Sequence, residues 1–414
     1  MDLTYPPEAE AFRTEIREWL DKHLPDGWGS PGFSMTADER RAFNDDWVQQ
    51  LRDGGWICAS WPTEYGGKGL TLLQQVVLNE EFARAQAPLR ADFFGDTLVG
   101  PTILQWGTEA QKQQFIPGIL NGAISWCQGF SEPDAGSDLA SLTTRAELDG
   151  DEWVVNGQKV WTTQAQYADY IFLLARTDPD APRHAGISYL LVPMKQPGVE
   201  VRPIEQVDGS ADFNEVFFTD ARCPKDNVVG GVDNGWKVAM TTLGFERGSS
   251  ATTGHRRFAR ELDAIIREAK ARGRDTDPLI RQRIARAWSN IKIMEINGYR
   301  TLTDALNGTH HAAAVAACNK MFWSETHQRT MELAMDIRRM DAQILAGDAD
   351  GAGRMLPGMR RGRADYPVDD LQASFFFSRS ETIWGGTAQI QRNIVGERVL
   401  GLPKEPRPEP APAN

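Results

Sequence analysis

The sequence is poor in cysteine and has no long apolar run, and each shortage excludes a class of protein. The four cysteines are far apart and form no CxxC pair: Cys58, Cys127, Cys223 and Cys318. This spacing excludes a disulfide framework and a cysteine-based zinc site, and it indicates reduced thiols. No run of about 18 apolar residues occurs, so we expect no membrane span. The first 20 residues lack the pattern of a signal peptide, so we expect a cytoplasmic protein.

An excess of positive charge is also missing. The net charge is −12 over 414 residues, which argues against nucleic acid or an anionic membrane surface as the main partner. A local basic pocket for a phosphorylated cofactor remains compatible with this balance. The apolar content of 41% and the charged content of 25% are those of a globular protein of two to three domains.

Helices are predicted for the N-terminal region. Residues 8–23 place Phe12, Ile16 and Leu20 at helical spacing. Three threonines are each followed three residues later by Glu or Gln, which is the signature of a capping box: Thr36, Thr71 and Thr108. The region 1–123 is therefore predicted to be an all-helical domain.

The pattern then changes to short β-rich runs separated by turn signals such as Asn156-Gly157, which is typical of an antiparallel sandwich or barrel. Helical periodicity returns over four further ranges: 236–272, 278–306, 310–345 and 388–400. We predict a middle β domain over 124–232, a C-terminal helical bundle over 233–402 and a disordered Pro-rich tail over 403–414. The predicted fold class is α+β.

Two stretches of the β region carry candidate ligand-binding groups. In "WCQGFSEPDAGSD", Asp134 and Asp138 are the acidic residues of what composition alone favours as a surface turn. In "NGQKVWTT", Trp161 taken alone is more easily interpreted as a buried core residue. Together the two stretches offer an aromatic face, hydroxyl groups and loop amides, which suit a flat heteroaromatic ligand among others.

A third stretch, "SETIWGGTAQIQRN", combines Trp384, Gly385 and Gly386 with Thr387 just before a predicted helix. Glycine is kept where the backbone adopts a positive φ or approaches another group closely. Thr387 fits the N-cap, and the free amides of a helix start favour an electron-rich ligand. The stretch is therefore predicted to be the floor of a binding site.

These motifs, in this order, resemble the acyl-CoA dehydrogenase family of flavoproteins. The resemblance rests on "SEPDAGSD", "NGQKVWTT", "FNEVFF", "LGFERG" and "GGTAQIQRNIVGERVLGLP", and it covers nearly the whole chain. The chain resembles in particular actinobacterial members that act on CoA thioesters of sterol side chains, often as heterotetramers. The resemblance implies an N-terminal helical domain, a middle β domain and a C-terminal four-helix bundle. It also implies FAD as cofactor, α,β-desaturation of an acyl-CoA, and electron-transfer flavoprotein as acceptor.

The resemblance assigns roles to individual residues. It places Gln128, Phe130 and Ser131 along the flavin ring, Trp161 stacked near it and Thr163 at its N5 atom. It places Thr387 and Gln389 at the phosphate and ribose portion. On the substrate side it implies Ser137, Trp384 and Gly385, with Ser137 at the pantetheine arm of CoA.

The catalytic base is not where many family members carry it, because Gly385 stands at the position of the expected glutamate. Either the subunit is inactive, or a base on another helix reaches the same space, as in relatives such as isovaleryl-CoA dehydrogenase. We favour the second interpretation, with Glu246 as the base and Arg247 near the CoA arm. Burial beside flavin and thioester is expected to raise the pKa of Glu246. The alternatives are a solvated Glu246 and an intrahelical salt bridge for Arg247.

Two further family motifs are absent, namely the Arg-x-x-Phe-Gly that serves a neighbour's FAD diphosphate and the glycine loop near its adenine. The corresponding ranges, 267–278 and 343–354, fit neither motif. We therefore predict a hetero-oligomer with two copies of each chain. The basic loop with Arg354, Arg360, Arg361 and Arg363 is more simply a solvated loop than a phosphate site. The alternative functions are a non-catalytic subunit that completes a partner's flavin site, and an acyl-CoA oxidase.

Overall fold

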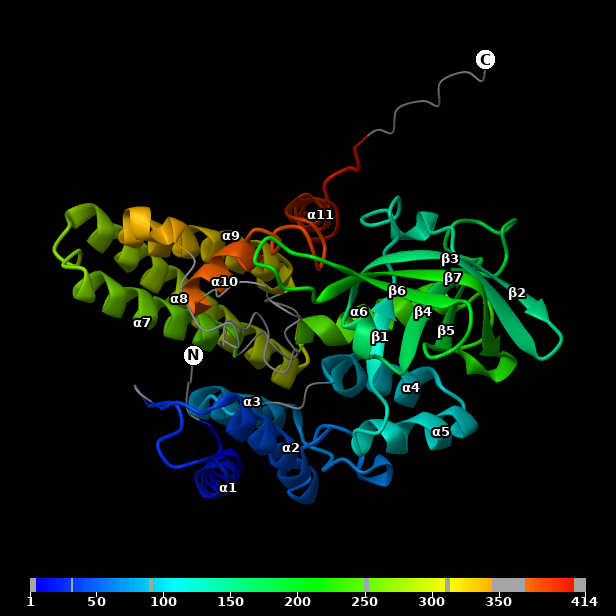
Figure 1. Cartoon of the computed structure of the whole chain (residues 1–414), viewed down its shortest axis with the longest axis horizontal. Coiled ribbons are helices and arrows are strands. Elements are labelled where there is room, and N and C mark those ends of the chain that lie inside the picture. The colour runs from blue at the N-terminus through cyan, green and yellow to red at the C-terminus, as the bar shows by residue number, and fades with distance from the viewer. Residues whose placement is uncertain are drawn as a thin grey trace, which may run out of the picture.

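A computed structural model describes residues 5–30, 33–88, 92–248, 253–309, 313–344 and 369–405. Helices come first, a β-sheet follows, and helices return after the sheet (Figure 1). The helices of the first part are α1 (Pro7–His23), α2 (Ala37–Asp53), α3 (Leu72–Ala85), α4 (Gly100–Trp106) and α5 (Glu109–Leu120). The predicted helix over residues 8–23 is confirmed as α1.

All three predicted capping boxes are present. The side chains of Thr36, Thr71 and Thr108 each accept a hydrogen bond from the amide three residues on, and the Glu or Gln there bonds back to the N-cap. These reciprocal bonds satisfy amides that a helix start leaves without partners. Local sequence therefore determines where α2, α3 and α5 begin.

The middle region forms one eight-stranded sheet. Its strands are β1 (Trp126–Gly129), β2 (Arg145–Asp149), β3 (Glu152–Thr163), β4 (Tyr170–Arg176), β5 (Ile187–Pro193), β6 (Val199–Ile204), β7 (Phe213–Pro224) and β8 (Val228–Val229). The order is β6-β7-β3-β2-β4-β5-β8, with β1 added beside β4. Most pairs are antiparallel, as predicted, but β1 and β2 pair with β4 in parallel. β4 and β5 are apolar along their length, which suits strands buried on both faces.

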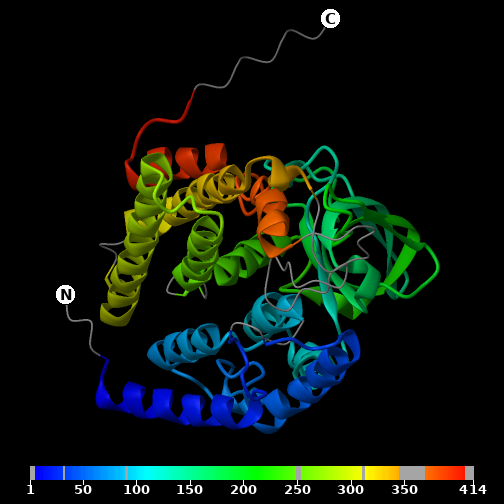
Figure 2. The same ribbon diagram turned by 60° about the vertical axis from the view of Figure 1, so that its left-hand side comes forward.

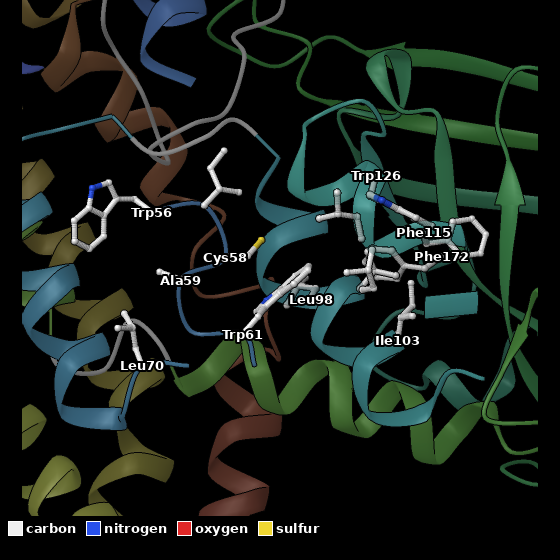
Figure 3. Close-up of a cluster of buried hydrophobic side chains, with 14 of the residues drawn as sticks. Trp56, Cys58, Ala59, Trp61, Leu70, Leu98, Ile103, Phe115, Trp126 and Phe172 are labelled. Carbon is white, nitrogen blue, oxygen red and sulfur yellow. The ribbon is translucent and has the colours of Figure 1, made fainter. Parts of the chain in front are cut away.

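One core joins the N-terminal helices to the sheet. Figure 3 shows part of it, in which Trp56 and Trp61 from the helical region lie in the same cluster as Trp126 and Phe172 from the sheet. A second cluster fills the other side of the sheet and includes Val155, Leu173 and Val216. Because the first core is shared, the N-terminal helices and one face of the sheet pack as one unit.

The last part of the chain forms a helical bundle (Figure 2). Its helices are α6 (Gly235–Gly248), α7 (Gly254–Ala271), α8 (Pro278–Asn307), α9 (Ala313–Arg338), α10 (Asp370–Ser378) and α11 (Ala388–Ile394). The helical pattern predicted over 236–272 belongs to two helices, α6 and α7. The apolar faces of α7, α8 and α9 meet in two clusters, one around Ile265 and Met331 and one around Leu262 and Ile291.

The predicted α+β fold, with helices, β domain and helical bundle in that order, is confirmed. The domain limits at 123/124 and 232/233 stay a proposal. The Gly- and Arg-rich loop, with its four arginines, and the end of the Pro-rich tail lie outside the described residues. Among the helices that are described, none has an apolar stretch long enough to cross a bilayer.

Candidate functional site

Trp161 is presented to solvent by an irregularity in β3. The pairing of β3 with β7 shifts between Lys159 and Thr162, so the ladder bulges at this point. Trp161 has a φ of 61°, and its side chain is 61% exposed with one edge toward the Phe213 ring. The interpretation as a buried core residue is wrong, because the bulge turns the side chain outward. A bulky residue in left-handed backbone, with its ring in solvent, marks a candidate ligand site.

The loop after β1 lies beside this strand end. The Val160 amide donates to the Ser131 carbonyl at 3.0 Å, and Lys159 Nζ donates to the Phe130 carbonyl at 3.1 Å. The structure therefore brings the loop residues together with Trp161. The Phe130 ring is 5% exposed and packs edge-on against Phe172, so Phe130 offers a ligand its main chain. Gln128, Ser131 and Thr163 are half-buried.

A buried ion pair fastens the two segments. Lys159 Nζ lies 2.8 Å from Glu132 Oε1, and the two side chains are 0% and 4% exposed. Glu132 also accepts hydrogen bonds from the amides of Thr143 and Thr144. Burial alone would raise the pKa of Glu132, but Lys159 and these amides lower it to about 2. Burial lowers the pKa of Lys159 to about 8, so the pair is charged at neutral pH.

The glycine stretch adopts the backbone predicted for it. Gly385 and Gly386 have φ values of 63° and 85°, and a Cβ on Gly386 would meet Gln391 Nε2 at 2.7 Å. Thr387 is the N-cap of α11 and accepts from the Ile390 amide, as predicted. Gln389 is exposed on the first turn of this helix.

The Trp384 ring is half-buried on the side of the bundle. Its ring centroid lies 5.7 Å from that of Trp323 and 5.9 Å from that of Phe377. Its Nε1 donates to Ser380 Oγ at 3.0 Å. The predicted site residues thus form two groups, one at the end of β3 and one at the start of α11.

Glu246 and Arg247 belong to α6, and their side chains lie outside the described residues. α6 itself is well anchored. Thr242 Oγ1 lies 2.8 Å from Thr102 Oγ1 on α4, and Trp106 Nε1 donates to Thr241 Oγ1 at 3.1 Å. These bonds connect the helix that carries Glu246 to the N-terminal helices.

The remaining predicted residues lie at the surface. Ser137 is exposed in the loop between β1 and β2. Asp138 accepts from Ser141 Oγ at 2.6 Å and pairs with Arg183 at 3.1 Å, so one contact lies within its own loop and the other reaches the loop between β4 and β5. A hollow of about 380 Å³ lies between α9 and α10, and Gln343, Gln372 and Phe375 are among the residues that line it.

Sequence reasoning missed the groups that support the site. Lys159 and Glu132 were not singled out, although both stand inside the two motifs that were. The signal available was a charged residue at an inward position of an otherwise apolar strand pattern, because such a residue needs a buried partner. His327, Lys320 and Glu381 in the bundle were also missed, since nothing local marks them.

The fold and these two groups of residues define a class, and comparison with known families agrees. Profiles of the N-terminal, middle and C-terminal domains of acyl-CoA dehydrogenases match residues 6–123, 127–221 and 233–400. The chain therefore belongs to the acyl-CoA dehydrogenase family and is an oxidoreductase of that class.

Among individual proteins, the chain is similar to acyl-CoA dehydrogenase IpdE1 of Mycobacterium tuberculosis. The two are 44% identical over 96% of this chain and 99% of the relative. A solved structure described as "Tcur3481-Tcur3483 steroid ACAD" has a TM-score of 0.78 at 32% identity, and covers 98% of this chain and 100% of its own. The ChsE4-ChsE5 complex from M. tuberculosis has a TM-score of 0.74 at 30% identity, with coverage of 98% and 100%. The predicted resemblance to actinobacterial members is confirmed.

Proposed function

We propose that the chain is an FAD-dependent acyl-CoA dehydrogenase that introduces an α,β double bond into a bulky CoA thioester. The observation that carries the cofactor assignment is Trp161, whose ring is held outward by a bulge next to Ser131. A flat exposed ring beside main-chain amides and the Thr163 hydroxyl fits a flavin, which has two aromatic faces and a hydrogen-bonding edge. Gly386 adds a backbone with a φ of 85° just before α11, which disfavours any residue with a side chain at this position.

In this proposal, different residues of the chain have different roles in the reaction. FAD, when bound, supplies the acceptor for the hydride that leaves the β-carbon. Glu246 accepts the proton from the α-carbon as the electron pair of that C–H bond forms the double bond. Because Gly385 has no side chain, a base carried by α6 can occupy the volume that a glutamate side chain at this position would fill. Main-chain amides around the site polarise the thioester carbonyl and so make the α-proton more acidic.

The substrate class follows from the relatives. One solved relative is described as a "steroid ACAD", and from this description we infer a steroid-derived CoA thioester for this chain. Ser137 and Arg247 are proposed to contact the CoA arm. Electron-transfer flavoprotein is the proposed acceptor, and a cytoplasmic location is part of the same proposal.

We also propose that the enzyme is a hetero-oligomer, α2β2, in which α8 contributes to the contact between different chains. Ile293 and Ile296 are 44% and 47% exposed on the outward face of α8, which runs along the outer edge of the bundle in Figure 2. The exposed charged residues of α8 are all basic: Arg281, Arg286, Lys292 and Arg300.

This charge pattern favours a different chain over a second copy. In a two-fold antiparallel pairing centred on Ile293, Arg286 of one copy would face Arg300 of the other, since each is seven residues from the centre. Like charges in such a contact are unfavourable. The occupant we propose is therefore a related chain whose facing helix carries carboxylates around an apolar stripe.

The test is anaerobic mixing of the purified complex with a panel of CoA thioesters. We expect flavin bleaching by steroid-derived thioesters and much weaker bleaching by straight-chain ones. Bleaching by straight-chain thioesters alone would contradict the substrate class. Peroxide formation in air at the rate of turnover would identify an oxidase instead.

A further inference from the structure

One face of α9 holds the segment that joins α10 to α11. Lys320 Nζ donates to the carbonyl oxygens of Glu381 at 2.6 Å and Gly386 at 3.0 Å. Gln328 Nε2 donates to the Ser378 carbonyl at 2.9 Å. Helical spacing places these side chains on the same face as two others, and we call the set of four the α9 clamp: Lys320, Trp323, His327 and Gln328.

His327 is the charged centre of the clamp. Its side chain is 1% exposed and lies between two carboxylates. Nδ1 is 2.5 Å from Glu381 Oε2, and Nε2 is 2.9 Å from Glu261 Oε2 as an ion-pair contact. Carboxylate oxygens close to both ring nitrogens favour the imidazolium, because only that form carries a proton on both nitrogens.

The two carboxylates at His327 also contact a cation from a neighbouring helix. From α7, Arg257 Nε lies 3.1 Å from Glu261 Oε1, and Arg257 Nη2 lies 3.6 Å from Glu381 Oε1. The Phe258 ring, 5.0 Å away, adds no charge, and Lys320 is directed at main-chain carbonyls. Arg260, also on α7, interacts electrostatically with Glu261. The Glu381 carboxylate, which is 0% exposed, lies closer to His327, at 2.5 Å, than to Arg257, at 3.6 Å. Loss of the His327 proton therefore removes the charged partner in the shorter of these two contacts of a buried carboxylate.

The clamp acts on the residues proposed to form the flavin and substrate site. Glu381 is three residues before Trp384, and Lys320 fixes the carbonyls at both ends of the interval from Glu381 to Gly386. Within this interval Gly385 holds a positive φ, and Trp384 rests on Trp323. Anchoring both ends of so short a segment determines the path of its backbone.

We propose that His327, as an imidazolium, is a positioning residue that sets the backbone of the Trp384-Gly385-Gly386 segment, and that the segment loosens when His327 is deprotonated. The effect on turnover rests on the proposed function. The effect on the segment itself does not, because it follows from the contacts of His327 alone.

The direction of the pH dependence follows from the neighbours of His327. Burial alone would lower the pKa of His327, but the Glu261 and Glu381 carboxylates reverse this and raise it above its usual value. Burial would raise the pKa of Glu261, and Arg257 and His327 lower it to about 2. Since the pKa of His327 is raised on folding, the clamp is fully formed below about pH 6.5 and is lost as the pH rises through the folded pKa.

The experiment is amide hydrogen exchange of peptides covering residues 378–391 in the full complex, from about pH 6 to pH 9.5, expressed as protection factors. In the wild type we expect protection to fall by at least about tenfold with rising pH in a one-proton transition above pH 6.5. His327→Gln should abolish the transition and leave the segment weakly protected throughout. Leu333→Ala is the matched control, because Leu333 lies on the same helix, is 1% exposed and packs in another cluster. It should lower thermal stability and keep the transition.

If His327→Gln does not fold, Glu381→Gln provides a second variant. It removes one negative charge from His327, so the transition should move to lower pH. A wild-type segment that is equally protected over the whole range, or a transition unchanged in Glu381→Gln, would overturn the proposal.

In turnover measurements, kcat of the wild type should fall over the same range of rising pH. A pH transition in exchange without any flavin bleaching by CoA thioesters would refute the proposed function and leave the clamp intact.

Discussion

At the residue scale, the backbone conformation and the exposed ring of Trp161 mark a candidate ligand site. Its left-handed backbone is unfavourable for an aromatic residue by roughly 1–2 kcal/mol. The structure keeps this conformation through the bulge in β3, and no apolar burial compensates for it, because the ring is 61% exposed. We infer that the exposed ring serves as a stacking surface for a ligand.

Replacement of Trp161 by Asn should separate stability from cofactor binding. Asn tolerates positive φ, so thermal stability of the cofactor-free protein should be unchanged or greater by up to about 1 kcal/mol. FAD affinity should fall by about tenfold because an aromatic contact is lost. Trp161→Phe is the control and should keep most of the affinity. Equal FAD affinity in wild type and Trp161→Asn, measured by flavin fluorescence, would exclude stacking.

The pair of Lys159 and Glu132 is predicted to matter for folding. Lys159→Met leaves Glu132 buried without its cation and should cost about 3–5 kcal/mol in urea unfolding. Lys195→Met is the control, since Lys195 is 77% exposed and its pair with Asp169 should contribute less than about 1 kcal/mol. Because the pKa of Glu132 is lowered, its contribution is present above about pH 4.3 and is lost as the pH falls toward 2. Equal losses in the two variants would contradict this account.

At the scale of elements, the parts that were predicted are those that local sequence controls. Capping boxes at Thr36, Thr71 and Thr108 and the N-cap at Thr387 were all found where the sequence placed them. The exposure of Trp161 was not predicted, because it depends on the register between β3 and β7. The pair of His327 and Glu381 joins residues 54 positions apart, and no local pattern marks such a contact.

A comparison of two capping glutamines tests how an element is joined to the rest of the fold. Gln111 and Gln74 occupy the same position in their capping boxes, but Gln111 also donates to the carbonyls of Asp226 and Val228 at 2.6 and 2.8 Å. Gln74→Ala should cost about 1 kcal/mol. Gln111→Ala should cost about 1–3 kcal/mol more, because it leaves two part-buried carbonyl contacts without this donor. Denaturant unfolding of the two variants measures the difference, and equal values would show that the added bonds contribute nothing.

At the scale of the whole molecule, the bundle carries both the start of α11 and the apolar, basic face of α8. If this face meets a different chain, Ile293→Asp should weaken assembly with that chain by at least about tenfold, because it buries a charge in the contact. Leu148→Asp is the matched control, since Leu148 is 47% exposed on β2 in the sheet. Analytical ultracentrifugation of mixed chains reports the outcome. Stable self-assembly of the chain alone, lost in Ile293→Asp, would show that a second copy occupies the face.

We propose that Glu246 is the base of a flavin-dependent desaturation, and single-turnover bleaching tests this role most directly. The complex is loaded with FAD, mixed anaerobically with an active CoA thioester and followed at the flavin absorbance. Glu246→Gln should retain FAD, and its rate of flavin bleaching should fall by about 10²–10⁴-fold. Glu147→Gln, on the exposed face of β2, should bleach at the wild-type rate. Full bleaching by Glu246→Gln in a complex that holds stoichiometric FAD would contradict the account.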